Sequence, residues 1–100
     1  MIVVISHHWC KPNMEALARE KIDQSGNIME SAPGFLYRYR IEPPADPTQI
    51  STMTAWADEA SYRSYRAARK PSDPKDPSVP YARVASEVFD VQRVHGHPQG

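Results

Sequence analysis

The chain has 100 residues, which is the size of one small domain and leaves no room for a second. Hydrophobic residues make up 40% and charged residues 24%, so the composition excludes a disordered chain and a membrane-embedded one. Lysine plus arginine equals aspartate plus glutamate at 12 each, and the zero net charge argues against nucleic acid or anionic lipid as a partner.

The cysteine content and the first residues bear on disulfides, metal sites and cellular location. Cys10 is the only cysteine, which excludes an intrachain disulfide and a zinc cluster built on paired thiolates. We interpret it as a small, half-buried apolar residue. The apolar run from Met1 to Ile5 is too short for the core of a secretion signal, and it meets His7 and His8 at once. We therefore expect a cytoplasmic protein with no membrane partner.

Residues 2–9 predict a first strand, because they form a β-branched run that turns polar at its end. Lys11-Pro12-Asn13 breaks this strand, and Asn13 is a plausible N-cap for a helix. Small and apolar residues then recur at steps of three and four, which predicts a helix whose stripe faces a sheet. The stripe comprises Met14, Leu17, Ala18, Ile22, Ser25, Met29 and Ala32. Pro33-Gly34 ends the helix.

Two strands and a second helix are expected next. Residues 35–41 alternate as a strand, and residues 48–56 supply a β-rich run that we expect to pair with it as a hairpin. One side of strand 35–41 is predicted to carry Phe35, Tyr37, Tyr39 and Ile41. Asp58 is an N-cap candidate for a helix over about 59–69, whose acidic first turn and basic last turn match the helix dipole.

A proline-rich segment separates this helix from the last strand. Residues 71–80 hold a proline at every third position, which removes amide donors and predicts an irregular loop. A loop of this kind is either a mobile lid or a segment packed against a partner. Residues 81–86 are compatible with one helical turn, residues 86–94 alternate as a last strand, and the tail 95–100 is expected to fray.

The order of these elements predicts a single α+β domain over residues 1–100 with the ferredoxin-like βαββαβ fold. Both helices then cover one face of a four-stranded antiparallel sheet, and the other face stays uncovered. The aromatic and aliphatic residues on the strands cannot all lie in water, because a large exposed apolar patch usually marks an interface. We therefore expect a homodimer formed through the uncovered face.

Three features, in this order along the chain, carry a family resemblance. They are Pro33-Gly34-Phe35 entering the second strand, Trp56 ending the third, and Asp58-Glu59-Ala60 opening the second helix. With them, residues 1–94 resemble the antibiotic biosynthesis monooxygenase family of dimeric α/β barrels. The resemblance implies a homodimer with a pocket between sheet and helices in each subunit. It also implies oxidation of phenols or quinols by molecular oxygen without flavin, haem or metal, so no cofactor is expected.

The same resemblance suggests site residues. Aromatic-oxidising members of the family carry a Trp at the end of the third strand, a Tyr six residues later and an Asn four residues before the Trp. Trp56 and Tyr62 match, whereas Thr52 replaces the Asn, so the amide that would hold the substrate oxygen is missing. The haem-degrading branch uses an Asn late in the first strand, a Trp on the second helix and a His after it. These positions read His7 or nearby, Tyr65 and a loop without His, so haem degradation is less expected.

The histidines differ in their predicted roles. His7 shares a strand face with Trp9 and is predicted to enter the pocket as a general base, since an ordinary histidine pKa of about 6.5 suits that task. The alternative is a hydrogen-bonded histidine at a strand end. His8 is expected to point the opposite way, toward the barrel or the partner. His95 and His97 lie in the tail, where solvated side chains are the simpler interpretation, and no metal is assigned.

The arginines are interpreted as ordinary surface charges. Arg38 and Arg40 alternate with tyrosines, but the glycine-containing signature of an RNA-recognition strand is absent, so cross-strand ion pairs are the better interpretation. Arg63, Arg66 and Arg69 recur every three residues, which is typical of a solvated helix face.

Three functions from different classes remain open. The first is a cofactor-independent monooxygenase acting on a small aromatic or quinol-type ligand. In it His7 accepts the proton, Trp56 and Tyr62 line the pocket, and Thr52 and Tyr65 contact the substrate. The second is a small-molecule binding or stress-related module without turnover, suggested by Thr52. The third is a structural dimeric partner in which the aromatic residues only pack.

Overall fold

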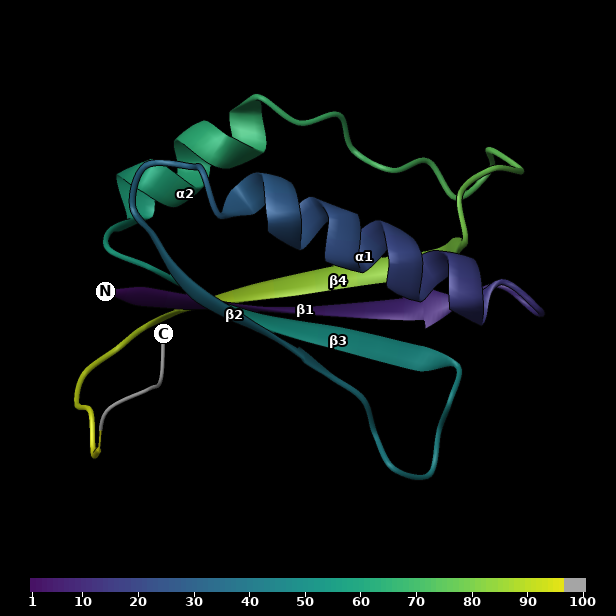
Figure 1. Ribbon diagram of the computed structural model, residues 1–100, viewed down its shortest axis with the longest axis horizontal. Helices are drawn as coiled ribbons and strands as arrows, with labels where there is room; N and C mark the ends of the chain where they lie inside the picture. Colours follow the sequence, from purple (N-terminus) through teal and green to yellow (C-terminus); the bar gives the residue numbers. More distant parts are fainter. Residues whose placement is uncertain (97–100) are drawn as a thin grey trace.

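Six elements follow one another in the order β, α, β, β, α, β in the computed structural model, which describes residues 1–96 (Figure 1). This order confirms the predicted α+β ferredoxin-like fold. Most of the tail that was expected to fray, including His97, lies outside the described residues. The elements are β1 (Ile2–Cys10), α1 (Glu15–Met29), β2 (Phe35–Ile41), β3 (Gln49–Trp56), α2 (Glu59–Ala67) and β4 (Tyr81–Asp90).

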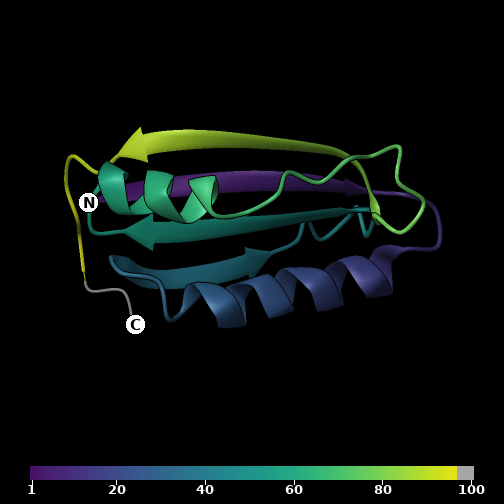
Figure 2. The same cartoon turned by 90° about the horizontal axis from the view of Figure 1, so that it is seen from above.

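The four strands form one antiparallel sheet in the order β2-β3-β1-β4. Ile2 of β1 lies opposite both Trp56 of β3 and Asp90 of β4, so β1 is a central strand. Both helices lie on the same face of the sheet, as predicted (Figures 1 and 2). α1 runs along β2, and α2 packs nearest to β3. Among residues 1–96, no helix lies on the opposite face of the sheet.

The side of the sheet that each residue of β1 occupies is set by Ile2 and Val4. Both are 4% exposed and pack in the core beneath the helices. Because side chains alternate along a strand, the even-numbered residues of β1 face the helices and the odd-numbered residues face away. The pairing register extends this rule across the sheet, so that Thr52 and Thr54 of β3 face the helices together with Ser6 and Val4.

The two helices begin in different ways. Asp58 caps α2 as predicted, and its side chain accepts a hydrogen bond of 2.7 Å from the amide of Ser61. The prediction that Asn13 caps α1 is wrong. Asn13 has a φ of 64° and forms the turn after β1, while the residue before the helix is Met14, which has no side-chain cap. Asn tolerates this left-handed conformation better than most residues, which explains its position.

A bulge at the start of β2 changes the predicted alternation. The pairing with β3 shifts between Phe35 and Tyr37, and Phe35 turns to the helix side, where its ring meets Trp56 edge-on at 5.9 Å. Gly34, just before the bulge, has a φ of 84°, and a Cβ at this position would collide with the side chain of Ser61. The Pro-Gly-Phe sequence therefore lets the start of α2 pack directly on the entry to β2.

The core consists of two apolar clusters at opposite ends of the sheet. One contains Ile2, Val4, Met29 and Trp56. The other contains Ala18, Ile22, Ile50 and Tyr81. Between them the sheet carries small polar side chains, among which Ser6 and Ser86 share a hydrogen bond of 2.8 Å. Serine and threonine are too short to reach the helices, so the middle of the layer is not filled by the sheet residues.

The last strand begins earlier than predicted. Residues 81–86 belong to β4, so the suggested helical turn is wrong, and the strand ends at Asp90 instead of continuing to residue 94. Pairing with β1 satisfies the backbone of this segment along its whole length, whereas one helical turn would leave most of its amides without partners. A register shift opposite Cys10 turns Tyr81 onto the helix side, where it is 7% exposed.

The face without helices is called the open face below. Its large side chains are Val3, Ile5, Trp9, Tyr37, Tyr39, Ile41, Met53 and Phe89. Ile41 and Phe89 are 44% and 46% exposed, and the guanidinium of Arg83 stacks on the Trp9 ring at 4.4 Å. No helix among the described residues is long and apolar enough to cross a membrane.

Candidate functional site

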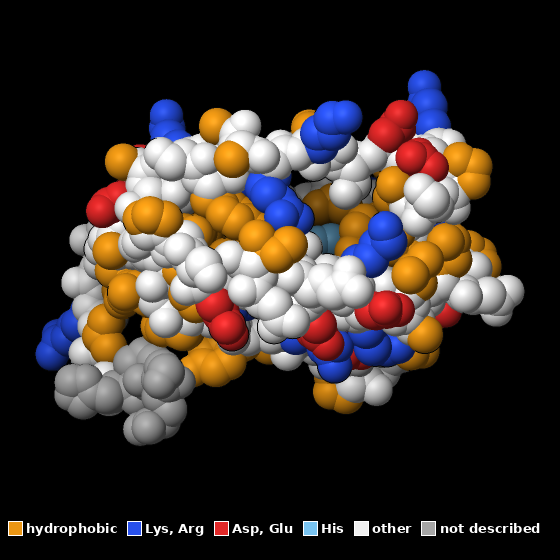
Figure 3. Space-filling model, turned by 45° about the horizontal axis from the view of Figure 1, so that its top comes forward, with side chains coloured by type: hydrophobic (Ala, Val, Ile, Leu, Met, Phe, Trp, Pro, Cys, Tyr) orange, Lys and Arg blue, Asp and Glu red, His pale blue; other side chains and the backbone are white. Residues whose placement is uncertain are grey.

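A cavity of about 440 Å³ lies between the sheet and the two helices, where the small polar residues leave the layer unfilled. This volume is within the usual range of small-molecule sites. Its floor comes from helix-facing residues of all four strands and its walls from α1, α2 and the start of the 71–80 loop. Figure 3 shows the opening, with basic side chains at its edge and a histidine deep within it.

The histidine in the cavity is His8, not the predicted His7. The prediction that His7 faces the cavity is wrong. Ile2 and Val4 on one side of β1 and Val3 and Ile5 on the other are all apolar, so alternation alone does not show which side is buried. His7 lies on the other side of the strand, where its Nδ1 is 2.7 Å from Ser51 Oγ. The geometry matches the alternative of a hydrogen-bonded strand residue.

The surroundings of His8 fix its protonation and its tautomer. Burial is the main cause that lowers the pKa of His8 from 6.5. The hydrogen bond with the Ile50 carbonyl is the next largest effect and opposes it, while repulsion from Arg38 and His7 lowers the pKa further. The ring is therefore neutral at pH 7. Its Nδ1 lies 3.1 Å from that carbonyl oxygen, which only accepts, so Nδ1 carries the hydrogen. The remaining nitrogen, Nε2, is then the proton-accepting atom of the ring.

The three predicted aromatic residues meet on one wall of the cavity. The ring of Trp56 lies 6.0 Å from that of Tyr62 and 5.4 Å from that of Tyr65, centre to centre, and all three line the cavity. Trp56 is fully buried, and its Nε1–H has no hydrogen-bond partner among the described residues. A buried donor of this kind usually has a partner, so this N–H is an unmet donor enclosed within the aromatic wall.

The floor supplies hydroxyl groups. Thr52, predicted to contact the substrate, does line the cavity and is 3% exposed. Tyr81, which the sequence did not indicate, lies at the far end with its ring 4.9 Å from that of His8. Burial raises the pKa of Tyr81 to about 12, so its phenol keeps its proton at neutral pH. The site therefore pairs a neutral base with a neutral hydrogen-bond donor.

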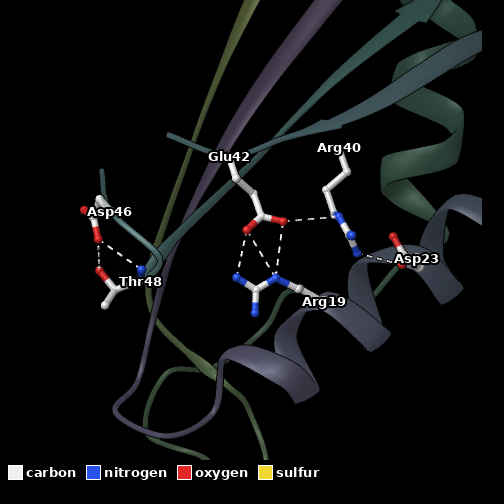
Figure 4. Close-up of polar contacts among 6 residues, drawn as sticks. All are labelled: Arg19, Asp23, Arg40, Glu42, Asp46 and Thr48. Atoms are coloured by element: carbon white, nitrogen blue, oxygen red, sulfur yellow. Dashed lines mark hydrogen bonds and ion pairs between the residues drawn. The ribbon is translucent and has the colours of Figure 1, made fainter. Parts of the chain in front are cut away.

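Arg38 is a further cavity residue that sequence reasoning missed. It was grouped with Arg40 as a surface charge, and only Arg40 behaves in that way. Arg40 lies 2.7 Å from Asp23 of α1 and 3.5 Å from Glu42, which also binds Arg19 (Figure 4). These pairs join α1 to β2, so the expectation of cross-strand pairs is wrong.

The side chain of Arg38 runs into the cavity instead. Among the described residues it has no carboxylate partner, and its only polar contact is the sulfur of Met29 at 3.8 Å. Burial lowers the pKa of Arg38 from 12.5, but a guanidinium remains protonated at neutral pH. The cavity therefore contains a half-buried positive charge. Among residues 1–96, no group of three His, Cys, Asp or Glu side chains is placed to hold a metal ion.

The sequence of residues 1–71 matches the model of the antibiotic biosynthesis monooxygenase family. The chain belongs to this family. The family match therefore confirms the resemblance predicted from the sequence. The matched range contains His8, Arg38, Thr52 and the three aromatic residues, and of the described residues that line the cavity only Ser72 and those of β4 lie outside it. None of the curated proteins compared with the chain matches it.

Solved structures share the fold of this family member at low sequence identity. SnoaB, a cofactor-independent oxygenase from Streptomyces nogalater, has a TM-score of 0.75 and 10% identity, with 93% of this chain and 94% of that chain covered. The haem degrader MhuD from Mycobacterium tuberculosis has a TM-score of 0.72 and 14% identity, covering 96% and 100%. A protein of unknown function from Nitrosomonas europaea reaches 0.77 at 14% identity, covering 99% and 95%.

Proposed function

We propose that this chain is a monooxygenase that oxidises a small aromatic or quinol-type compound in the cavity without a cofactor of its own. The observation that carries the proposal is the neutral His8, whose hydrogen is held on Nδ1 by a backbone carbonyl and whose Nε2 is left to accept a proton. Membership of a monooxygenase family supports this function. His8 replaces His7 as the base in this proposal.

The chemistry needs only the substrate and oxygen. His8 Nε2 takes the hydroxyl proton of a phenol, and the resulting phenolate is electron-rich enough to reduce O₂ directly. With a naphthol, one oxygen atom enters the ring to give a quinone and the other leaves as water, so the substrate supplies all four electrons. Arg38 lowers the energy of the anion, and its electrostatic effect is strengthened because its guanidinium is half-buried in the cavity.

The aromatic wall positions the substrate in this scheme. Trp56, Tyr62 and Tyr65 offer flat apolar surfaces against which a fused ring can stack. Thr52 lies on the floor, where the aromatic-oxidising relatives described above carry an amide. Its side chain is shorter than that of Asn and its hydroxyl donates one hydrogen bond, whereas a carboxamide donates two.

A binding function without turnover is the second candidate, and Thr52 is the observation that favours it. Without the amide, the cavity can hold an aromatic ligand that is never oxidised. Haem degradation has less support, because Tyr65 stands where that branch carries a Trp and the loop 71–80 has no His.

We also propose that the chain forms a homodimer through the open face. Exposed Tyr39, Ile41 and Phe89 support this, because a monomer would leave them in water. A cytoplasmic location belongs to the same proposal and agrees with the ordinary globular composition of the chain.

Oxygen uptake tests the proposed activity. Purified protein is mixed in metal-free buffer with a panel of naphthols, anthrones and quinols, and the rate above spontaneous oxidation is measured with an oxygen electrode. We expect uptake with at least one compound and one oxygen atom from ¹⁸O₂ in the product. No uptake across the panel, together with a ligand that raises the melting temperature and is recovered unchanged, would establish the binding function instead.

A further inference from the structure

The charges around the cavity are all of one sign. Among the described residues, four basic side chains line it and no aspartate or glutamate does, although the whole chain has 12 of each class. The four are Arg38, Arg66, Arg69 and Lys70. The carboxylate of α2 that is nearest in sequence to these arginines, Glu59, does not reach the cavity. It pairs with Arg63 at 2.8 Å on the outer surface of the helix. The predicted solvated arginine face of this helix is therefore divided, because Arg63 faces outward while Arg66 and Arg69 border the cavity.

Arg38 is the inner positive charge of this set. Arg38 and Arg40 are two residues apart on β2 and share the helix-facing side, yet Arg40 has two carboxylates within 4 Å and Arg38 has none. α1 passes directly above Arg38 at Gly26, where an added Cβ would lie 3.7 Å from its Cδ and its guanidinium. An unpaired charge in such a place costs free energy, and a bound anion would remove that cost.

Arg69 stands at the mouth of the cavity. Its guanidinium lies over the Tyr65 ring at 5.6 Å and donates a hydrogen bond of 3.4 Å to Ser25 of α1. It therefore connects the two helices across the opening, with Arg66 and Lys70 beside it. An anion entering from solvent meets these three basic residues first and Arg38 afterwards, which is the arrangement that attracts and retains a negative group.

We propose that the ligand of this cavity is an aromatic acid, with its ring against Trp56, Tyr62 and Tyr65 and its carboxylate on the guanidinium of Arg38. An arginine fork suits a carboxylate because two parallel N–H groups meet its two oxygens. This inference rests on the proposed function in that it concerns the same cavity, but it requires binding only and not turnover. The three basic residues at the mouth add attraction that salt screens, whereas the inner contact is screened much less.

A matched pair of ligands tests the inference without any change to the protein. 1-Hydroxy-2-naphthoate and its methyl ester share one ring system and differ in the charge of a single group. Their affinities are measured under nitrogen by titration calorimetry. We expect the acid to bind at least about tenfold more tightly, in line with a hydrogen bond to a charged group. Equal affinity, or preference for the ester, would overturn the inference.

Two variants then locate the carboxylate. Arg38→Gln should abolish the preference for the acid and leave the affinity for the ester within about twofold. Arg40→Gln is the matched control, since it removes the same guanidinium from the same strand outside the cavity and should keep the preference. Arg38→Lys should retain part of it. A preference that survives in Arg38→Gln, with its melting temperature showing a folded protein, would place the anion elsewhere and overturn the assignment.

Two further measurements separate this inference from the proposed activity. Benzoate, hexanoate and inorganic phosphate are titrated as well, and binding of phosphate as tight as that of the naphthoate would mean a general anion site, which contradicts the inference. Oxygen uptake is recorded independently. Tight binding of the acid without oxygen uptake would contradict the proposed activity and support the inference. Oxygen uptake at equal rates, with equal affinities for acid and ester, would contradict the inference and support the activity.

Discussion

The carbonyl oxygen of Ile50 and the Nδ1 of His8 lie 3.1 Å apart across the β1–β3 pair, so a strand backbone decides which ring nitrogen of the cavity histidine is free. A backbone carbonyl does not ionise, and it cannot move without moving the strand that carries it. The tautomer of His8 is therefore as rigid as the pairing of the two central strands.

The activity should depend on pH through His8. Because its pKa lies below 6.5, the proton-accepting form dominates at pH 7, and kcat/KM should fall as the pH drops through the lowered value. His8→Gln should reduce kcat/KM by about 10²- to 10⁴-fold and remove this acid limb. His7→Gln is the control and should keep the limb. A His8→Gln protein with unchanged rate would show that another group accepts the proton.

Stability should follow the same titration in a predictable direction. The folded pKa of His8 is lowered, so just below pH 6.5 the unfolded chain binds this proton more readily than the folded one. The contribution of neutral His8 is therefore present above pH 6.5 and is lost as the pH falls. We expect the melting temperature to decline between pH 7.5 and pH 5.5, and to decline less in His8→Gln. An identical decline in both proteins would assign the effect to other groups.

A single methyl group at Gly34 should destabilise the fold. Gly34→Ala combines a φ of 84° with a collision against Ser61, whereas Gly96 has a φ of 76° and no atom of the described residues within 4 Å of an added Cβ. We expect a loss of about 1–3 kcal/mol at Gly34 and a smaller one for Gly96→Ala, measured by urea unfolding. The double variant Gly34→Ala, Ser61→Gly should recover part of the loss. Equal effects at both glycines would mean that strain alone matters and that the contact with α2 does not.

The proposed dimer can be tested with neighbouring residues of β4. Phe89 and Val88 are 46% and 47% exposed, but Phe89 lies on the open face and Val88 on the helix side. The wild-type chain should sediment as a dimer at micromolar concentration, Phe89→Glu should shift it toward monomer by about tenfold or more in Kd, and Val88→Glu should not. A folded wild-type monomer at that concentration would exclude the interface.

The missing amide offers a gain-of-function test. Thr52→Asn places a carboxamide on the cavity floor, and because one oriented donor can change a rate by about 10²- to 10³-fold, we expect turnover of a naphthol to rise at least about tenfold. Thr54→Asn, at a buried position on the same face of β3, serves as the control and should give no gain. A folded Thr52→Asn protein without increased turnover would show that the amide is not what this cavity lacks.

The fold was predictable from the sequence because turn residues separate the elements clearly, and Asp58 marked the start of α2 by its own chemistry. The site was predictable only where the residues were aromatic, as at Trp56 and Tyr62. The choice between His7 and His8 depends on which side of β1 is buried, and that side is fixed by pairing with β3, over 40 residues away in sequence.

Arg38 shows the same limit. Nothing in the local sequence distinguishes it from Arg40, because the difference arises from where Asp23 and Glu42 come to lie in three dimensions. The bulge beside Phe35 and the early start of β4 at Tyr81 also depend on long-range backbone pairing. Local sequence patterns therefore predict most of the helices and strands, whereas contacts between strands determine which side chains line the cavity.

The division of the apolar core into two ends has an evolutionary consequence. Because each end of the layer is secured by its own tightly packed group, the short hydroxyl residues in between bear little of the folding free energy. Substitutions at these positions can change which ligands the cavity binds without unfolding the protein. A protein built in this way can acquire new preferences for small molecules by exchanging a few central side chains, without first having to gain extra stability.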